Sequence, residues 1–292
     1  MTKGEVCFSI VNAFIMIFMI VVCLYPLLYV LFASFSDSSR LMSYRGLLYK
    51  PLGFNVEAYL KVFKNPNILT GYKNTIIYVV CHTALALVMT TMGAFVLSRR
   101  QFMIKNLMMG MIAFTMVFGG GLIPTFIMYK AIGLYDNRLS IIIPGCISAY
   151  NLIVMRTSFA AIPASLEESV RVDGGNDLHV LFYIVIPLSK AIIAVMVLFY
   201  GVNMWNSWFQ ASIYLKNRSY YPLQLFLREI LISNSTDSMM TSAGSSSASD
   251  RESIAESIKY ATIVVSTVPI LCVYPFLQKY FVSGVMIGAI KG

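Results

Sequence analysis

The sequence predicts an all-α integral membrane protein, a helical bundle with six transmembrane helices. The first observation is composition: 58% of the 292 residues are apolar and 12% are charged, whereas a soluble domain carries about 25% charged residues. The second is a mean hydropathy of +0.74. The 22 basic and 13 acidic residues are too few to coat a soluble domain of this size, and this composition also excludes intrinsic disorder.

The third observation is the spacing of the charged residues, which separate six strongly apolar stretches. About 20 residues of helix cross a hydrocarbon core of roughly 30 Å. The first stretch is longer than the apolar core of a signal peptide, which has about 7–15 residues. We therefore expect an uncleaved helix that also directs insertion, rather than a cleaved signal peptide. The fourth stretch is the shortest. The predicted spans are 8–33, 74–98, 106–129, 139–156, 188–210 and 260–280.

Orientation follows from the short loop between the second and third spans. It holds Arg99, Arg100 and Lys105 and no acid, which places it in the cytoplasm by the positive-inside rule. Six spans then put both termini in the cytoplasm. The loop of residues 34–72 is also basic and lies outside in this topology, a conflict that its length allows, because long loops translocate largely regardless of charge. The net charge of +9 is attributed to topology and anionic lipid, not to nucleic acid.

Outside the spans, residues 36–72 predict an external loop with short helical pieces. Residues 233–257 are Ser-rich and of low complexity, which predicts a mobile external tether. The five cysteines are scattered without a C-x-x-C pair, so we expect buried apolar residues, with no disulfide framework and no metal site. They are Cys7, Cys23, Cys81, Cys146 and Cys272.

The most informative stretch is the cytoplasmic loop between spans four and five, residues 160–187. Pro163 and Ser165 open a predicted helix, whose first turn carries Glu167 and Glu168, where the helix dipole favours anions. Residues 173–175, Asp-Gly-Gly, end it with turn chemistry.

A second short helix is expected over residues 178–185, and Pro187 marks the start of the fifth span. Four acids and one Arg stand beside apolar residues in this loop. A connector lying on lipid carries a Lys/Arg-rich polar face instead, so the surface suits a groove on a soluble partner.

At these residues the chain resembles the permease subunits of ATP-binding-cassette importers, whose EAA loop has the pattern E-A-A-x-x-D-G-A. Residues 168–175 match it as E-S-V-R-V-D-G-G, with Ser169 and Val170 in place of the two alanines, and Ile186-Pro187 closes the motif. The resemblance implies that helices at 164–182 couple the spans to a partner ATPase. The coupling residues would be Glu167, Glu168, Arg171, Asp173, Gly174 and Pro187.

The resemblance extends to nearly the whole chain. Residues 53–59, 74–75 and 203–208 resemble carbohydrate-uptake permeases of the maltose-transporter type, and residues 284–292 resemble the tail of the polysaccharide or aldouronate subgroup. It implies a bacterial cytoplasmic membrane, a second homologous permease, two ATPase subunits and an extracytoplasmic solute-binding protein. ATP and Mg would bind in those partners, and this chain would hold no catalytic residue and no cofactor. The tail, residues 283–292, either reaches the ATPase dimer interface or is a frayed terminus.

Candidate substrate contacts are aromatic and amide side chains in spans four and five, because aromatic faces stack on sugar rings and amides bond hydroxyls. The alternative for the tryptophans is an interfacial belt. Residues 119–121, Gly-Gly-Gly before Pro124, predict either tight packing with a kink or a break that lines the pathway. The candidates are Tyr150, Asn151, Tyr200, Asn203, Trp205, Asn206 and Trp208.

Other functions have weaker support. A secondary transporter often uses buried carboxylates, but the six apolar stretches offer only His82 as an ionisable group besides Cys and Tyr. Two histidines, His82 and His179, give no metal pair, and no phosphate-binding G-x-x-x-x-G-K-[ST] occurs. An importer of a non-sugar solute also stays open. The expected substrate is an oligosaccharide, either neutral or uronate-containing, since residues 37–73 hold six basic and two acidic residues, 6 − 2 = +4.

Overall fold

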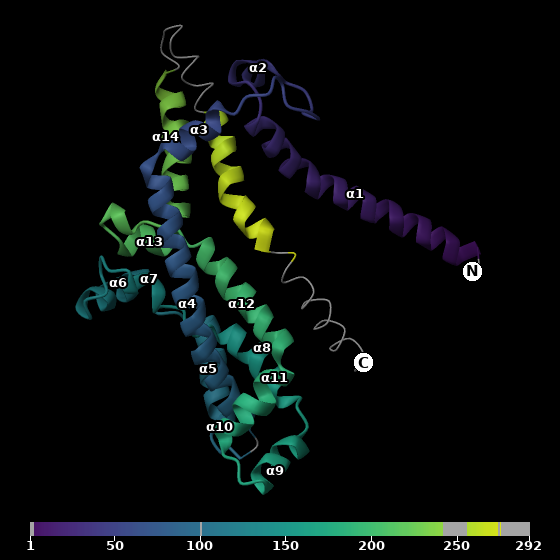
Figure 1. Cartoon of the computed structure of the whole chain (residues 1–292), viewed down its shortest axis with the longest axis vertical. Helices are drawn as coiled ribbons and strands as arrows, with labels where there is room; N and C mark the ends of the chain where they lie inside the picture. The colour runs from purple at the N-terminus through teal and green to yellow at the C-terminus, as the bar shows by residue number, and fades with distance from the viewer. Residues whose placement is uncertain (1–2, 100, 242–255, 274, 276–292) are drawn as a thin grey trace. The chain divides into compact units, whose positions relative to one another are not determined.

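The computed structural model describes residues 3–99, 101–241, 256–273 and 275. This described part is helical, with one isolated antiparallel bridge between Ser36 and Phe54 and no strand. Its residues group into two compact units, one from Met1–Leu69 with Phe226–Pro269, the other from Thr70–Leu225 with Ile270–Gly292. The unit boundaries fall inside three helices, and each unit is considered separately below (Figure 1).

The first unit contains a long apolar helix that the described residues leave largely uncovered. In α1 (Lys3–Ser34) almost every large apolar side chain is exposed, which suits contact with lipid or with another subunit. Its C-terminal end packs Ala33 with Leu41, Leu48 and Tyr260. The other described helices of the unit are α2 (Ser38–Ser43), α3 (Glu57–Lys64), the start of α4 (Pro66–Ser98), most of α14 (Leu223–Thr241) and most of the helix Glu256–Val273.

The second unit holds the principal core. Apolar residues of α4, α5, α8 and α12 meet in it, and these helices lie side by side in Figure 1; Met155 and Phe159 of α8 are fully buried at its centre. The helices of this unit, beside α4, are α5 (Lys105–Val117), α6 (Leu122–Ala131), α7 (Leu139–Ile142), α8 (Ala149–Ala160), α9 (Ala164–Val172), α10 (Asp177–His179), the π-helix η1 (Val180–Val185), α11 (Ile186–Leu188), α12 (Lys190–Trp205), α13 (Phe209–Tyr214) and the 3-10 helix η2 (Arg218–Tyr220).

Three of the predicted spans are broken. The third bends by 111° between α5 and α6, and Gly121, at φ 80°, stands at the break. The bend falls at the predicted residues 119–121, but Pro124 does not cause it, because Pro124 lies in the first turn of α6, where its missing N–H costs no helical bond. Within the described part of the chain, no atom lies within 4 Å of a Cβ built at Gly119 or Gly120, so these glycines mark a bend and no tight contact.

The fourth and fifth predicted spans are interrupted as well. Over residues 139–156 the chain forms α7, then a turn through Gly145 at φ 77°, then α8. The fifth begins with a bend of 82° between Asp177–Leu188 and α12.

Among the described residues, three helices are long and apolar enough to cross a membrane: Gly4–Ser34, Pro66–Ser98 and Glu256–Val273. The number rises to five if each bent pair is one span. These helices indicate a membrane protein, while the count of six stays a prediction.

The predicted tether over residues 233–257 is partly helical. α14 continues to Thr241, and the next described helix begins at Glu256. Residues 242–255 lie outside the described residues, and so do most of the end of the sixth predicted span and the C-terminal tail, residues 283–292.

Candidate functional site

The loop of residues 160–187 begins with α9, which ends in a Schellman motif. The N–H of Gly175 donates to the carbonyl of Val170 at 2.8 Å, and the N–H of Gly174 donates to the carbonyl of Arg171 at 3.1 Å. Gly174 has φ 80°, the left-handed conformation that this motif requires and that glycine adopts without strain. The turn chemistry of residues 173–175 therefore ends the helix where the sequence predicts.

The second half of the loop departs from the predicted short α-helix. Asn176 caps α10, accepting at Oδ1 from the N–H of His179 at 3.0 Å, while His179 Nδ1 accepts from the N–H of Asn176 at 3.3 Å. The following residues form the π-helix η1. Pro187 has no N–H to offer the carbonyl four residues before it, which favours the wider hydrogen-bond spacing seen there.

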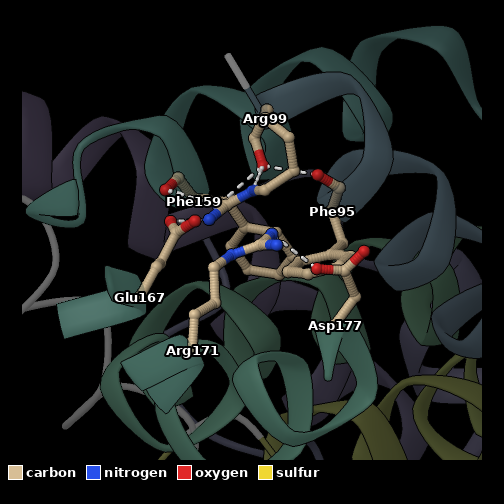
Figure 2. Close-up of polar contacts among 7 residues, drawn as sticks. Phe95, Arg99, Phe159, Glu167, Arg171 and Asp177 are labelled. Atoms are coloured by element: carbon tan, nitrogen blue, oxygen red, sulfur yellow. Dashed lines mark hydrogen bonds and ion pairs between the residues drawn. The ribbon is translucent and has the colours of Figure 1, made fainter. Parts of the chain in front are cut away.

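The two adjacent glutamates of α9 lie in different surroundings. The Glu167 carboxylate forms an ion pair with Arg99, and only 18% of its side chain is exposed (Figure 2). Glu168 is exposed to solvent, as are Asp173 and Gly174. Arg171 pairs with Asp177, the first residue of the following helix α10, at 2.6 Å, and this pair is also exposed.

Arg99, which the sequence offered only as a topology marker, is the centre of this polar cluster. Its guanidinium donates to Ser98 Oγ at 2.8 and 3.0 Å and to the carbonyl of Phe159 at 3.3 Å. It also lies 4.8 Å from the centroid of the Phe95 ring. Burial lowers the pKa of the Arg99 guanidinium, and the carboxylate of Asp177 counteracts part of this shift. The signal in the sequence was a basic residue directly after an apolar span.

The outward side of the loop combines acids with exposed apolar side chains. Val172 is 87% exposed and Tyr183 73% exposed, with Leu178 and Phe182 also exposed. Such a surface resembles the face of a helix that docks into a groove on a partner more than a basic lipid-binding face.

The second candidate region is a cleft of about 1010 Å³ inside the second unit, at the upper end of the size range of ligand sites. The sequence analysis placed seven substrate candidates, and the structure brings six of them to the wall of this cleft. These six are Tyr150, Asn151, Tyr200, Asn203, Asn206 and Trp208. Trp205 is not among the lining residues; it is 9% exposed and its ring lies 6.2 Å from that of Tyr72.

The cleft wall combines polar and aromatic side chains with aliphatic ones such as Leu198 and Val202, and its described lining residues include no carboxylate, Lys or Arg. Sequence reasoning missed several of its members, including Ser148 and Gln210. The Tyr200 hydroxyl is less available to a ligand than expected, because it already bonds within the protein. It lies 2.7 Å from Thr90 Oγ1 and accepts from the N–H of Ser148 at 3.2 Å. Its role in the cleft is therefore to hold α4, α8 and α12 together.

The opposite end of α4 is fixed by a second set of polar contacts. Asn74 Nδ2 donates to the carbonyls of Ser219 and Tyr221 at 2.8 and 3.0 Å, and Arg138 donates to Asn74 Oδ1 at 3.1 Å. The Tyr78 hydroxyl donates to the carbonyl of Tyr220 at 2.7 Å. The segment from Asn74 to Ser98 is thus anchored at both ends.

Comparison with known proteins identifies the family. No family model matches the chain. It is 38% identical to the polygalacturonan/rhamnogalacturonan transport system permease protein YtcP of Bacillus subtilis (strain 168), over 99% of this chain and 100% of that protein. It is 35% identical to Protein LplC of the same organism, over 100% of this chain and 97% of that protein.

Among solved structures, the chain is similar to one from a bacterial ABC transporter involved in the import of the acidic polysaccharide alginate. The TM-score is 0.84 and the sequence identity 33%, and the match covers 96% of this chain and 99% of that chain. Near-complete coverage in both directions means that the whole fold, and not one motif, is shared. The chain therefore belongs to the permease proteins of ATP-binding-cassette (ABC) sugar transport systems.

Proposed function

We propose that the chain is a membrane-spanning subunit of an ATP-driven importer that carries an oligosaccharide across the cytoplasmic membrane by alternating access. It works with a second, homologous permease, two ATPase subunits and an extracytoplasmic solute-binding protein. ATP and Mg bind in the ATPases, and this chain contributes motion and a pathway rather than catalysis. The observation that carries the proposal is the 160–187 loop, whose exposed acidic and apolar side is suited to an ATPase groove.

The proposed topology has six spans with both termini in the cytoplasm. The segment Asn74–Ser98 of α4 is about 36 Å long at 1.5 Å per residue, enough to cross a hydrocarbon core of about 30 Å. Its Arg99 end lies with the 160–187 loop and belongs to the cytoplasmic side. Its Asn74 end lies with residues 219–221 and belongs to the outer side.

The cleft is the proposed part of the sugar pathway in this chain. Trp208 and Tyr150 offer ring faces, and Asn203 and Asn206 offer amides, which suits a ligand made of rings and hydroxyls. Its described lining residues include no Asp or Glu, so the wall does not repel a carboxylate, and with no Lys or Arg it offers hydrogen bonds and ring stacking instead of an ion pair.

For the substrate we favour a uronate-containing oligosaccharide. The names of two similar proteins refer to acidic polysaccharides, polygalacturonan and alginate. In the first unit, Arg40, Arg45, Lys50 and Lys64 are exposed, whereas Glu57 is already paired with Lys61 at 2.7 Å. A basic external surface raises the local concentration of an anionic ligand or of an acidic binding protein.

Uptake by the reconstituted complex tests both parts of this proposal. Proteoliposomes with the two permeases, the ATPases and the cognate binding protein are supplied with neutral and uronate oligomers of equal length. ATP-dependent uptake of the uronate oligomer, weakened by salt, is expected. Uptake of the neutral oligomer alone contradicts the acidic substrate, and uptake of neither points to the non-sugar importer. Uptake driven by an ion gradient without ATP identifies the ion-coupled alternative.

A further inference from the structure

The two neighbouring glutamates of α9 differ in their contacts: Glu167 pairs with Arg99, and Glu168 is exposed to solvent. We propose that Arg99 and Glu167 form an internal clamp that ties α9 to the ends of α4 and α8, so that Glu167 transmits the motion which Glu168 and the exposed side of the loop receive. This inference rests on the proposed function, because it concerns how that loop couples. Arg99 is a positioning residue in it and touches neither substrate nor nucleotide.

The first argument is electrostatic. Arg99 follows directly on the C-terminal end of α4, and its guanidinium also binds the carbonyl of Phe159 in the last turn of α8. Helix C-termini carry a partial negative charge and unpaired carbonyls, so one cation serves both ends. Glu167 supplies a full negative charge from the first turn of α9. Three helix ends therefore meet on one side chain, as Figure 2 shows.

The second argument is burial. Only 13% of the Arg99 side chain and 18% of the Glu167 side chain are exposed, against 41% and 65% for Arg171 and Asp177 nearby. A pair that is largely withdrawn from water is screened less by salt, and removing one partner leaves a charge without its counterion. The exposed pair Arg171–Asp177 lacks these properties and stays within the loop.

The third argument is connectivity. Between Ala160 and Ala164 the chain linking α8 to α9 is short, and Pro163 limits its freedom. Arg156 of α8 donates to the carbonyl of Leu97 at 3.2 Å, which joins α8 to the end of α4 as well. Val170 and Ile162 pack on the core of the second unit. With the clamp closed, α9 moves with the two spans as one body. With the clamp open, α9 keeps the linker, this apolar contact and the exposed Arg171–Asp177 pair within the loop.

The experiment measures coupling in the assembled complex, as sugar taken up per ATP hydrolysed. Arg99→Gln and Glu167→Gln are each expected to leave assembly and ATP hydrolysis in place while lowering this ratio. The expected loss is roughly 5- to 150-fold, the size of an ordinary coupling between two sites. Arg99→Lys keeps the charge but not the forked donor geometry, so it should recover part of the loss. Gln101→Ala, an exposed neighbour in the same short loop, is the matched control and should behave as wild type.

The charge-exchanged double variant Arg99→Glu/Glu167→Arg tests whether the two side chains act through their ion pair or independently of each other. It should couple better than either charge-reversed single variant, though less well than wild type, because a carboxylate at position 99 faces two helix C-termini. Transport and ATP hydrolysis falling together, in step with the amount of assembled complex, would show a merely structural role and overturn the proposal. Unchanged coupling in both single variants would also overturn it.

Hydrogen exchange in the same complexes gives a second readout that does not require transport. Amides of α9 should lose protection in Glu167→Gln, while those of α12 should keep theirs. Equal protection of α9 in wild type and variant contradicts the clamp. The proposed function fails on different grounds, namely a wild-type complex that neither hydrolyses ATP nor takes up sugar.

Discussion

At the scale of single residues, the end of α9 shows how two adjacent glycines can be required for different reasons. Gly174 has open space around it but a φ of 80°, so its constraint is conformational. Gly175 has no such φ, yet a Cβ built on it would lie 2.5 Å from Val170 Cγ1 and 2.9 Å from the Val170 carbonyl oxygen. The EAA pattern has Ala at both positions where this chain has Val170 and Gly175, so a larger residue faces a smaller one.

This size exchange predicts a specific non-additivity. Gly175→Ala should destabilise by about 1–3 kcal/mol through overpacking, and combining it with Val170→Ala should recover part of that loss. Gly174→Ala should cost about 1–2 kcal/mol through the left-handed backbone, and Val170→Ala should not relieve it. Thermal unfolding of the purified complex carrying each single and double variant measures these differences. Equal, additive losses at the two glycines would contradict the packing explanation.

Glu168 gives the second prediction at this scale. Unlike Glu167, which pairs with Arg99, Glu168 is exposed to solvent. The Glu168→Lys variant should therefore insert into the membrane normally and keep its fold. A cation facing a groove suited to an anion should weaken ATPase association, and transport should be lost. Co-purification of the ATPase with the variant, against wild type and Gln101→Ala, measures this. Wild-type association and transport would show that Glu168 has no part in coupling.

At the scale of elements, the sequence predicted the C-terminal end of α4 and both ends of α9, because local chemistry marks them: charges after an apolar run, an acidic first turn and a Gly-Gly stop. α4 itself begins at Pro66 and not at residue 74, and α12 ends at Trp205 and not at residue 210. The sequence predicted a kink or a break at residues 119–121, and the chain bends there at Gly121. It did not predict the turn through Gly145 or the π-helix before Pro187, which depend on which backbone groups find partners, and that is decided by neighbouring helices. The Arg99–Glu167 pair was missed for the same reason, since 68 positions of sequence separate residues that the fold brings together.

The end of α12 and the turn after it give the prediction for this scale, because Trp205 and Trp208 lie in different places. Trp208 lines the cleft, whereas Trp205 is 9% exposed beside Tyr72. Trp208→Ala should lower uptake by about tenfold, the equivalent of about 1.4 kcal/mol of binding, with a smaller loss of Tm than Trp205→Ala because Trp208 is only partly buried. Trp205→Ala should lower the free energy of unfolding by about 3–5 kcal/mol, as buried Trp truncations do. Uptake at limiting binding-protein concentration and Tm are measured on both; the reverse pattern would remove Trp208 from the pathway.

At the scale of the whole molecule, the topology rests on α4 being held at both ends by different partners. The Asn74 end binds the carbonyls of Ser219 and Tyr221, and the other end is joined to α8 and α9 through Arg99. These contacts place residues 219–221 and the 160–187 loop about one membrane thickness apart, and therefore on opposite sides if α4 crosses the bilayer.

Single-cysteine labelling checks this arrangement, starting from a chain in which the five native cysteines are replaced. Gln101→Cys and Ser165→Cys should react with an impermeant thiol reagent only in inside-out vesicles. Lys216→Cys should react only in right-side-out vesicles, because Lys216 adjoins the segment that holds the Asn74 end. Arg45→Cys tests the basic loop of residues 34–72, which we place outside against the usual charge rule, so it should follow Lys216→Cys. Reaction of Gln101→Cys and Lys216→Cys from one side would show that α4 does not cross the membrane, and reaction of Arg45→Cys from the cytoplasmic side would return that loop to the side its charge favours.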